Sequence, residues 1–199
     1  MAVNVSNIVV GEATLKLGDS ANATSITAMD AFTDLGATQN GVEISWEPDM
    51  VDIEIDQYGD AARIVQSKVK VMVKTTLAEG TLNNLAIAWN YDQETGGDHI
   101  KSNNAYDQTS NGYTSTKGFN FGAQSVFPYE KGLVIEGTAP GSAAGAIKKR
   151  RFYTKRAISM DASNISMKRA EASVFAVGFR ILPNTADVGY EYGKIIDQA

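Results

Sequence analysis

Residues 51–56 read Val-Asp-Ile-Glu-Ile-Asp, so apolar and acidic side chains alternate strictly along this stretch. Successive side chains of a β-strand point to opposite faces of the sheet, so the alternation predicts a half-buried strand with Val51, Ile53 and Ile55 toward a core. The same period of two recurs along the chain, which predicts a protein that is mainly β. Further strands are expected at 13–17, 42–46, 69–74, 132–136, 151–159 and 173–182.

One helix is expected beside these strands. Thr76-Leu77-Ala78-Glu79 matches the capping box, in which the threonine accepts a backbone N–H and the glutamate reaches back to the cap. The apolar side chains that follow lie at helical spacing and form one stripe: Leu82, Leu85, Ala86 and Trp89. The fold class expected is therefore mainly β, a β-sandwich or barrel-forming sheet with one flanking α-helix.

The length and the charge pattern limit the possible functions. A chain of 199 residues suits a single domain, residues 1–199. The net charge is −5, but residues 1–62 carry −10 and residues 148–180 carry +7. An acidic total argues against a general nucleic-acid binder. A chain polarised in this way can pair its own ends, or pair the acidic part of one copy with the basic part of another.

No chemical motif for catalysis is found. The chain has no cysteine and one histidine, His99, which excludes disulfide frameworks, zinc ribbons, thiol nucleophiles and histidine-based triads. The carboxylates Asp52, Glu54 and Asp56 share one strand face with nothing to separate their environments, as a glycosidase pair would require. We therefore expect no enzyme activity, no metal and no cofactor.

A basic stretch runs from Lys148 to Arg156. It is compatible with a nucleic-acid-binding strand, since two aromatic residues lie among the cations. It is also compatible with a strand that contacts the acidic first third of another copy, and the charge blocks favour this second interpretation. The candidate contact residues are Lys148, Lys149, Arg150, Arg151, Lys155 and Arg156.

A long polar segment covers residues 92–122. Loops of this length inside a compact domain are usually functional or disordered. The aromatic residues within it favour a loop that packs on a neighbouring subunit or ring. These candidate contact residues are Tyr106, Tyr113, Phe119 and Phe121.

No targeting signal is expected. The first residues lack a basic region followed by an apolar run, and the longest apolar-looking run, 172–179, is far shorter than a membrane span. We expect a chain that is synthesised in a cytoplasm and assembles from there.

The order of these features resembles the tail tube (major tail) proteins of tailed bacteriophages, over most of residues 8–91 and 148–198. The acidic strand Val51–Asp60 and the strand-to-helix run Val69–Leu85 carry most of the likeness. The remaining elements are an early strand at 8–17, a turn from Gly36 to Gly41, the strand 42–46, the basic strand and a closing strand at 172–183. The insertion at 92–122 is not part of the pattern.

The resemblance implies an assembly. Members of this family are β-sandwiches with a flanking helix, six subunits join their sheets into a ring, and rings stack into a hollow tube. The implied partners are further copies of the chain, the tape-measure protein, the tail terminator and the tail-tip or baseplate proteins, with transient passage of DNA and no membrane. The implied location is the tail of the virion, after assembly in the cytoplasm of the bacterial host.

On this interpretation Asp52, Glu54 and Asp56 are candidates for the lumen, because like charges repel phosphate. A contact with the basic stretch, or an outer solvated face, is an equally open interpretation of these three acids. Two other classes of function are also compatible with the sequence. One is another structural protein of a virion or secretion tube, such as an adaptor or a cap, and the other is a ligand-binding β-sandwich.

Overall fold

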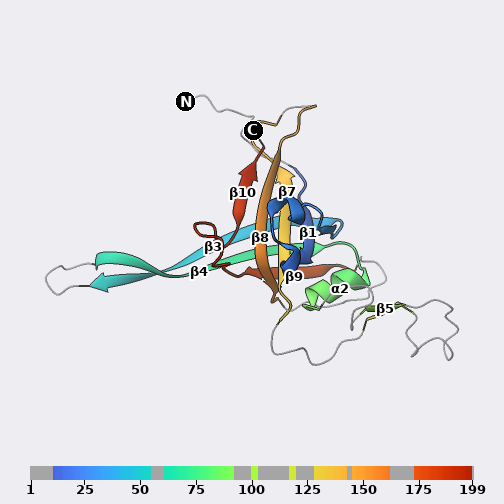
Figure 1. The fold of residues 1–199 in the computed structure, drawn as a ribbon, viewed down its shortest axis with the longest axis horizontal. Helices are drawn as coiled ribbons and strands as arrows, with labels where there is room; N and C mark the ends of the chain where they lie inside the picture. Colours follow the sequence, from blue (N-terminus) through green and yellow to red (C-terminus); the bar gives the residue numbers. More distant parts are fainter. Residues whose placement is uncertain are drawn as a thin grey trace.

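The computed structural model describes residues 11–54, 61–91, 100–102, 117–119, 128–142, 145–161 and 173–198, and the fold is mainly β (Figure 1). The elements are β1 (Thr14–Asp19), η2 (Ser20–Asn22), α1 (Ile26–Met29), β2 (Thr33–Asp34), β3 (Thr38–Glu54), β4 (Ala61–Leu77), α2 (Leu82–Ala88), β5 (Ile100–Ser102), β6 (Lys117–Phe119), β7 (Lys131–Thr138), β8 (Lys149–Ser159), β9 (Phe175–Ile181) and β10 (Lys194–Asp197). All six stretches predicted as further strands lie in or across strands of this structure.

Eight strands form one antiparallel sheet that does not close. Its order is β2-β1-β7-β8-β9-β4-β3, and β10 also pairs with β8. In β8, residues 150–153 pair with β10 and residues 157–159 pair with β9. Strands β1, β7, β8 and β10 run across strands β9, β4 and β3, so the sheet folds into two crossed layers (Figure 1).

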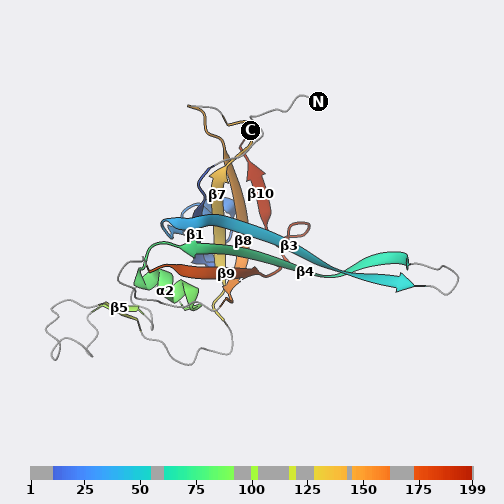
Figure 2. The same cartoon turned by 180° about the vertical axis from the view of Figure 1, so that it is seen from behind.

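The main core lies between the two layers and under α2. Buried apolar side chains come from β1, β7 and β8 on one side and from β4, β9 and α2 on the other. Its fully buried members include Leu15, Leu17, Val73, Leu133 and Phe179. Figure 2 shows α2 beside β9, at the end of the molecule away from the free end of the β3–β4 ribbon.

The helix was predicted correctly but its start was wrong. The N-cap is Thr81, whose Oγ1 accepts the N–H of Asn84 at 3.1 Å. Thr76 is part of β4, paired with β9, and therefore cannot cap a helix. Glu79 binds a different backbone group, because its Oε1 accepts the N–H of Ala37 at 3.1 Å. Tertiary contacts thus override a local capping motif.

Strands β3 and β4 form a ribbon of 17 residues on each side, and its far part extends away from both layers (Figures 1 and 2). We call residues 49–54 of β3 and 61–68 of β4 the arm. The prediction that Val51 and Ile53 face a core is wrong for the single chain, since they are 50% and 46% exposed. Ile55 lies outside the described residues.

The expected loop at 92–122 contains a short two-stranded sheet. Ile100 pairs with Phe119 and Ser102 with Lys117, in the ladder between β5 and β6. The ring of Phe119 contacts Trp89 and Tyr91, with centroids 5.9 and 5.2 Å away. Part of this segment therefore packs next to α2 of its own chain.

Candidate assembly surface

The register of the β3–β4 ribbon defines two faces. Residues directly opposite each other in an antiparallel pair point to the same side. Ile44 lies opposite Val73, which is buried in the core, so their side is the core face. The other side is the outer face, which carries Glu47 opposite Lys70.

A β-bulge in β4 changes the pattern at the base of the arm. Asp49 pairs with Lys68 and Met50 with Gln66, so Ser67 has no residue opposite it. The Ser67 hydroxyl donates to the carbonyl oxygen of Asp49 at 3.2 Å. Because β3 itself keeps its alternation, Val51 lies on the outer face of the ribbon.

The same alternation places the two acids of the described arm. Asp52 and Glu54 lie on the core face of the ribbon, the side that carries Met50 and Ile64. The strict alternation predicted for residues 51–54 is present. The apolar residues of 51–54 lie on the outer face, whereas the apolar residues of 42–48 lie on the core face.

Exposed apolar side chains therefore occupy both faces of the arm. Ile64 is 62% exposed, and no other element of the described structure covers it. Monomeric proteins rarely leave contiguous apolar patches of this kind uncovered unless a partner binds there. The exposed apolar members are Met50, Val51, Ile53, Ile64 and Val65.

The apolar surface continues from the arm to the open side of the core. Ile44 and Trp46 lie on the core face of β3 and are 41% and 58% exposed. Ile195 of β10 is opposite Phe152, hence on the same side of its layer as the core, and is 60% exposed. Trp46 meets Tyr192 edge to face at 6.0 Å. We call Ile44, Trp46 and Ile195 the open rim.

The outer face of the ribbon carries charges in two rows. The acids lie on β3 and the lysines on β4, and the Glu47–Lys70 pair has an N–O distance of 3.2 Å. Both side chains are about half exposed, so this pair contributes little to stability. The opposed pairs are Glu43 and Lys74, Glu47 and Lys70, and Asp49 and Lys68.

The basic strand binds carboxylates of its own chain. Lys149 and Arg151 both pair with Glu136, and Arg151 also lies 3.3 Å from Asp30. Burial acts to raise the pKa of Glu136, but the hydrogen bonds from Lys149 and Arg151 outweigh it and lower that pKa. The Tyr153 hydroxyl donates to Asp30 at 2.8 Å.

Three further cations of this strand have partners. The Arg150 guanidinium donates twice to Asp197, each at 2.6 Å, and lowers the pKa of that carboxyl. Lys155 pairs with Asp187 at 2.7 Å. The guanidinium of Arg156 makes two bonds of 2.7 Å to Glu130, whose pKa it lowers.

These pairs bear on the predicted role of the basic stretch. The partner acids are Asp30, Glu130, Glu136, Asp187 and Asp197, and none lies within 43–60. Lys148 forms no ion pair with another residue that the structure describes. The cations have partners without a second copy, and their contact with another subunit stays a prediction.

The other candidate residues are only partly covered by the structure. Asp52 and Glu54 are exposed on the arm, and Phe119 packs on its own chain as described. Asp56, Tyr106, Tyr113 and Phe121 lie outside the described residues.

The sequence interpretation missed Met50, Ile64, Val65 and the open rim. A signal was present, because apolar residues occupy even positions from 42 to 50 and odd positions from 51 to 55.

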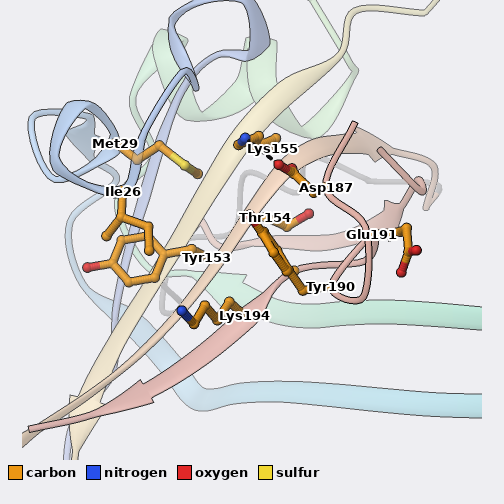
Figure 3. A pocket seen from close by; sticks show the side chains of 10 residues that line it. Ile26, Met29, Tyr153, Thr154, Lys155, Asp187, Tyr190, Glu191 and Lys194 are labelled. Atoms are coloured by element: carbon orange, nitrogen blue, oxygen red, sulfur yellow. Dashed lines mark hydrogen bonds and ion pairs between the residues drawn. The ribbon is translucent and has the colours of Figure 1, made fainter. Parts of the chain in front are cut away.

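A narrow pocket lies between α1, β8 and the loop after β9 (Figure 3). Ile26, Met29 and Tyr153 line one side, and Tyr190 and Lys194 line another. The Lys155–Asp187 ion pair forms part of its wall (Figure 3). Within the described ranges no three His, Cys, Asp or Glu side chains are grouped so that they could hold a metal ion.

No protein-family model matches the chain, and no curated protein matches its sequence. In the part of the chain that the structure describes, no helix has both the length and the apolar character needed to cross a membrane.

Proposed function

We propose that this protein is a structural subunit that assembles with copies of itself into the tail tube of a bacteriophage. One observation carries the proposal: the β3–β4 arm extends from the body with exposed apolar side chains on both faces. The crossed β-layers with α2 beside them agree with the fold that the resemblance implies. The tape-measure protein, the tail terminator, the tail-tip proteins and transiting DNA are partners on the same proposal.

The arm is suited to reach a neighbouring subunit. Six strand residues span about 20 Å at 3.3–3.4 Å per residue. A two-stranded ribbon alone is only marginally stable in water, so such an arm gains from a surface to pack on. Complete burial of its five half-exposed apolar side chains would contribute on the order of 5 kcal/mol before the entropic cost of association.

The position of the arm favours an open assembly. It extends from one side of the body, where it can reach a different surface of a neighbouring copy (Figures 1 and 2). A contact between two different surfaces of one chain generates rings if the rotation closes and filaments if it does not. A tube of stacked rings needs a closing contact within each ring and a non-closing contact between successive rings.

The surroundings of Asp52 and Glu54 bear on the three interpretations left open for them: the lumen, a subunit contact and an outer solvated face. On the core face of the arm they lie beside Met50 and Ile64, which are about half exposed or more. A protein interface has a polar rim around an apolar core, so carboxylates beside exposed apolar side chains are compatible with the rim of such an interface. We therefore assign them to subunit contact in preference to the lumen.

Electron microscopy of concentrated purified protein tests the proposal. Wild-type protein should form tubes or stacks of six-fold rings. Ile64→Asp/Val65→Asp should abolish them while the far-ultraviolet circular dichroism stays unchanged. The matched control is Val188→Asp, which adds a charge at a side chain that is 83% exposed and off the arm.

The other outcomes separate the competing functions. Isolated rings that never stack would indicate a cap or an adaptor, and a monomer that binds a glycan would indicate a ligand-binding sandwich. Tubes that form equally well with the double aspartate variant would refute the role of the arm.

A further inference from the structure

The last strand of the sheet has a free edge of unusual character. β3 is last in the strand order, so one of its edges has no strand partner within the described chain. Free edges present unpaired N–H and C=O groups that can pair with another chain. Glu43, Glu47 and Asp49 line this edge on the outer face, and Pro48 lies among them.

The simplest partner for such an edge is a second β3. Two identical strands can pair antiparallel about a twofold axis, with the outer faces of both copies on the same side of the joined sheet. In such a pair one residue lies opposite its own copy, and this residue is the centre of the register. Acids of the two copies lie opposite each other in each of the four registers centred on residues 45, 46, 47 and 48. Like charges that face each other across a strand pair are destabilising.

The four registers differ only in which acids meet. In the register centred on Ser45, Glu43 lies opposite Glu47, and in the register centred on Trp46, Glu43 lies opposite Asp49. In the register centred on Glu47 the two Glu47 side chains face each other, and in the register centred on Pro48, Glu47 lies opposite Asp49. Each acid also lies opposite a lysine of the neighbouring strand β4. These exposed acid–lysine pairs are weak and do not cancel the repulsion between acids of two β3 strands at close range.

Pro48 acts in the same direction. Proline has no N–H, so a strand that adds beside it loses a hydrogen-bond donor. Proline and charged side chains on an edge strand are known means of preventing edge-to-edge pairing.

We propose that the acidic row and Pro48 make the edge of β3 reject a second β3, so that another copy must offer a different surface and copies join head to tail. This inference rests on the proposed self-assembly. A twofold pair would use the same edge of both copies, so this contact is closed and cannot itself propagate into a ring. The open rim and the core face of the arm, with Met50 and Ile64, stay available for that other copy.

A single-cysteine reporter can test the inference, because the natural chain has no cysteine. Ser45→Cys lies in the middle of the acidic row, and a short bismaleimide can cross-link two such strands when they pair edge to edge. The test variant is Glu43→Gln/Glu47→Gln/Asp49→Asn. Its matched control is Lys68→Gln/Lys70→Gln/Lys74→Gln, which removes three charges of opposite sign from the same face. All proteins carry Ser45→Cys.

The acid-neutral variant should give at least about tenfold more cross-linked dimer than the reporter alone in dilute solution at neutral pH. The lysine-neutral control should give no increase. A second measurement needs no charge substitution: raising the salt from about 0.1 M to about 1 M should increase the dimer of the reporter alone, because salt screens exposed charges.

The inference is wrong if the acid-neutral variant cross-links no more than the lysine-neutral control, or if the reporter alone already forms these dimers at low salt. If the acid-neutral variant does not fold, the salt series decides, since a yield that stays constant with salt contradicts the inference. The proposed function fails in a different way, through wild-type protein that forms neither rings nor tubes at high concentration.

Discussion

At the scale of single residues, Thr81 and Thr76 separate what a motif predicts from what the fold uses. The Thr81 side chain caps α2, and removal of a capping hydroxyl costs about 1 kcal/mol. Thr81→Ala should therefore lower the free energy of unfolding by about 1 kcal/mol in urea denaturation. Thr81→Ser keeps the capping hydroxyl and should retain most of the stability, and a loss equal to that of Thr81→Ala would contradict the assigned cap. Thr76→Ala is no test of the cap, because it removes a β-branched residue from β4, which costs up to about 1 kcal/mol in strand propensity.

Glu136 has two cationic partners, Lys149 and Arg151, and only 16% of its side chain is exposed. Its pKa is lowered in the folded chain, so its contribution is complete above about pH 4.3, the unfolded value, and is lost as the pH falls through the lower folded pKa. Glu136→Gln should cost about 1–2 kcal/mol at pH 7, and the difference from wild type should shrink in acid. Urea denaturation at several pH values measures this.

Glu47 provides the matched control for Glu136. It also pairs with one lysine, but more than half of its side chain is exposed. Glu47→Gln should leave the free energy of unfolding nearly unchanged at every pH of the same series. An equal loss in the two variants would show that burial is not what distinguishes them.

At the scale of elements, strands β1 and β7 are joined at a glycine pair covered by an aromatic ring. Gly18 is opposite Gly132, and a Cβ built on Gly132 would lie 2.6 Å from the ring of Phe32. Gly132→Ala should therefore displace Phe32 and cost about 1–3 kcal/mol. Gly137→Ala in the same strand meets nothing closer than 3.7 Å and should be nearly neutral.

A double variant shows whether the ring is the cause. In a Phe32→Ala background the nearest remaining atom is the Cβ of Ala23, 3.1 Å from the built Cβ, so Gly132→Ala should cost less than in the wild type without becoming neutral. Thermal unfolding of the four proteins gives the coupling. Additive losses would mean that Phe32 is not the group that resists the alanine, which leaves Ala23 as the other close neighbour.

Elements were also the scale at which the sequence was most informative. The period of two located β1, β3, β4, β7, β8 and β9, because alternation reports directly on which side of a strand is buried. It could not show that Val51 and Ile53 stay exposed, since an interface with another chain and a core produce the same pattern. Nor could the sequence pattern locate the N-cap of α2, because this depends on tertiary contacts such as the hydrogen bond from Ala37 to Glu79.

At the scale of the whole molecule, much of the polarised charge is paired within one chain, which is one of the two arrangements that the sequence allows. Acids distant in sequence, such as Asp30 and Asp197, reach the basic strand within one chain. The acids of 43–49 lie opposite lysines of β4. Net charge along a sequence cannot reveal this pairing, because it depends on the order of strands in the sheet.

This pairing predicts how charge reversal will act. Lys149→Glu/Arg150→Glu/Arg151→Glu places three new acids beside Glu136, Asp30 and Asp197, so it should lower the melting temperature of the monomer itself. Loss of assembly in this variant would then report on folding and not on a subunit contact. Differential scanning calorimetry of dilute protein measures the change.

The location of the rescuing substitutions decides between pairing within a chain and pairing between chains. Reversal of Glu136 and Asp197 to lysine in the triple variant should restore much of the melting temperature, because it rebuilds the pairs on β8 with opposite signs. Reversal of Glu43 and Glu47 should not, since neither is paired with β8 in the described chain. If the second set restores assembly and the first does not, the basic strand binds the acidic part of another copy.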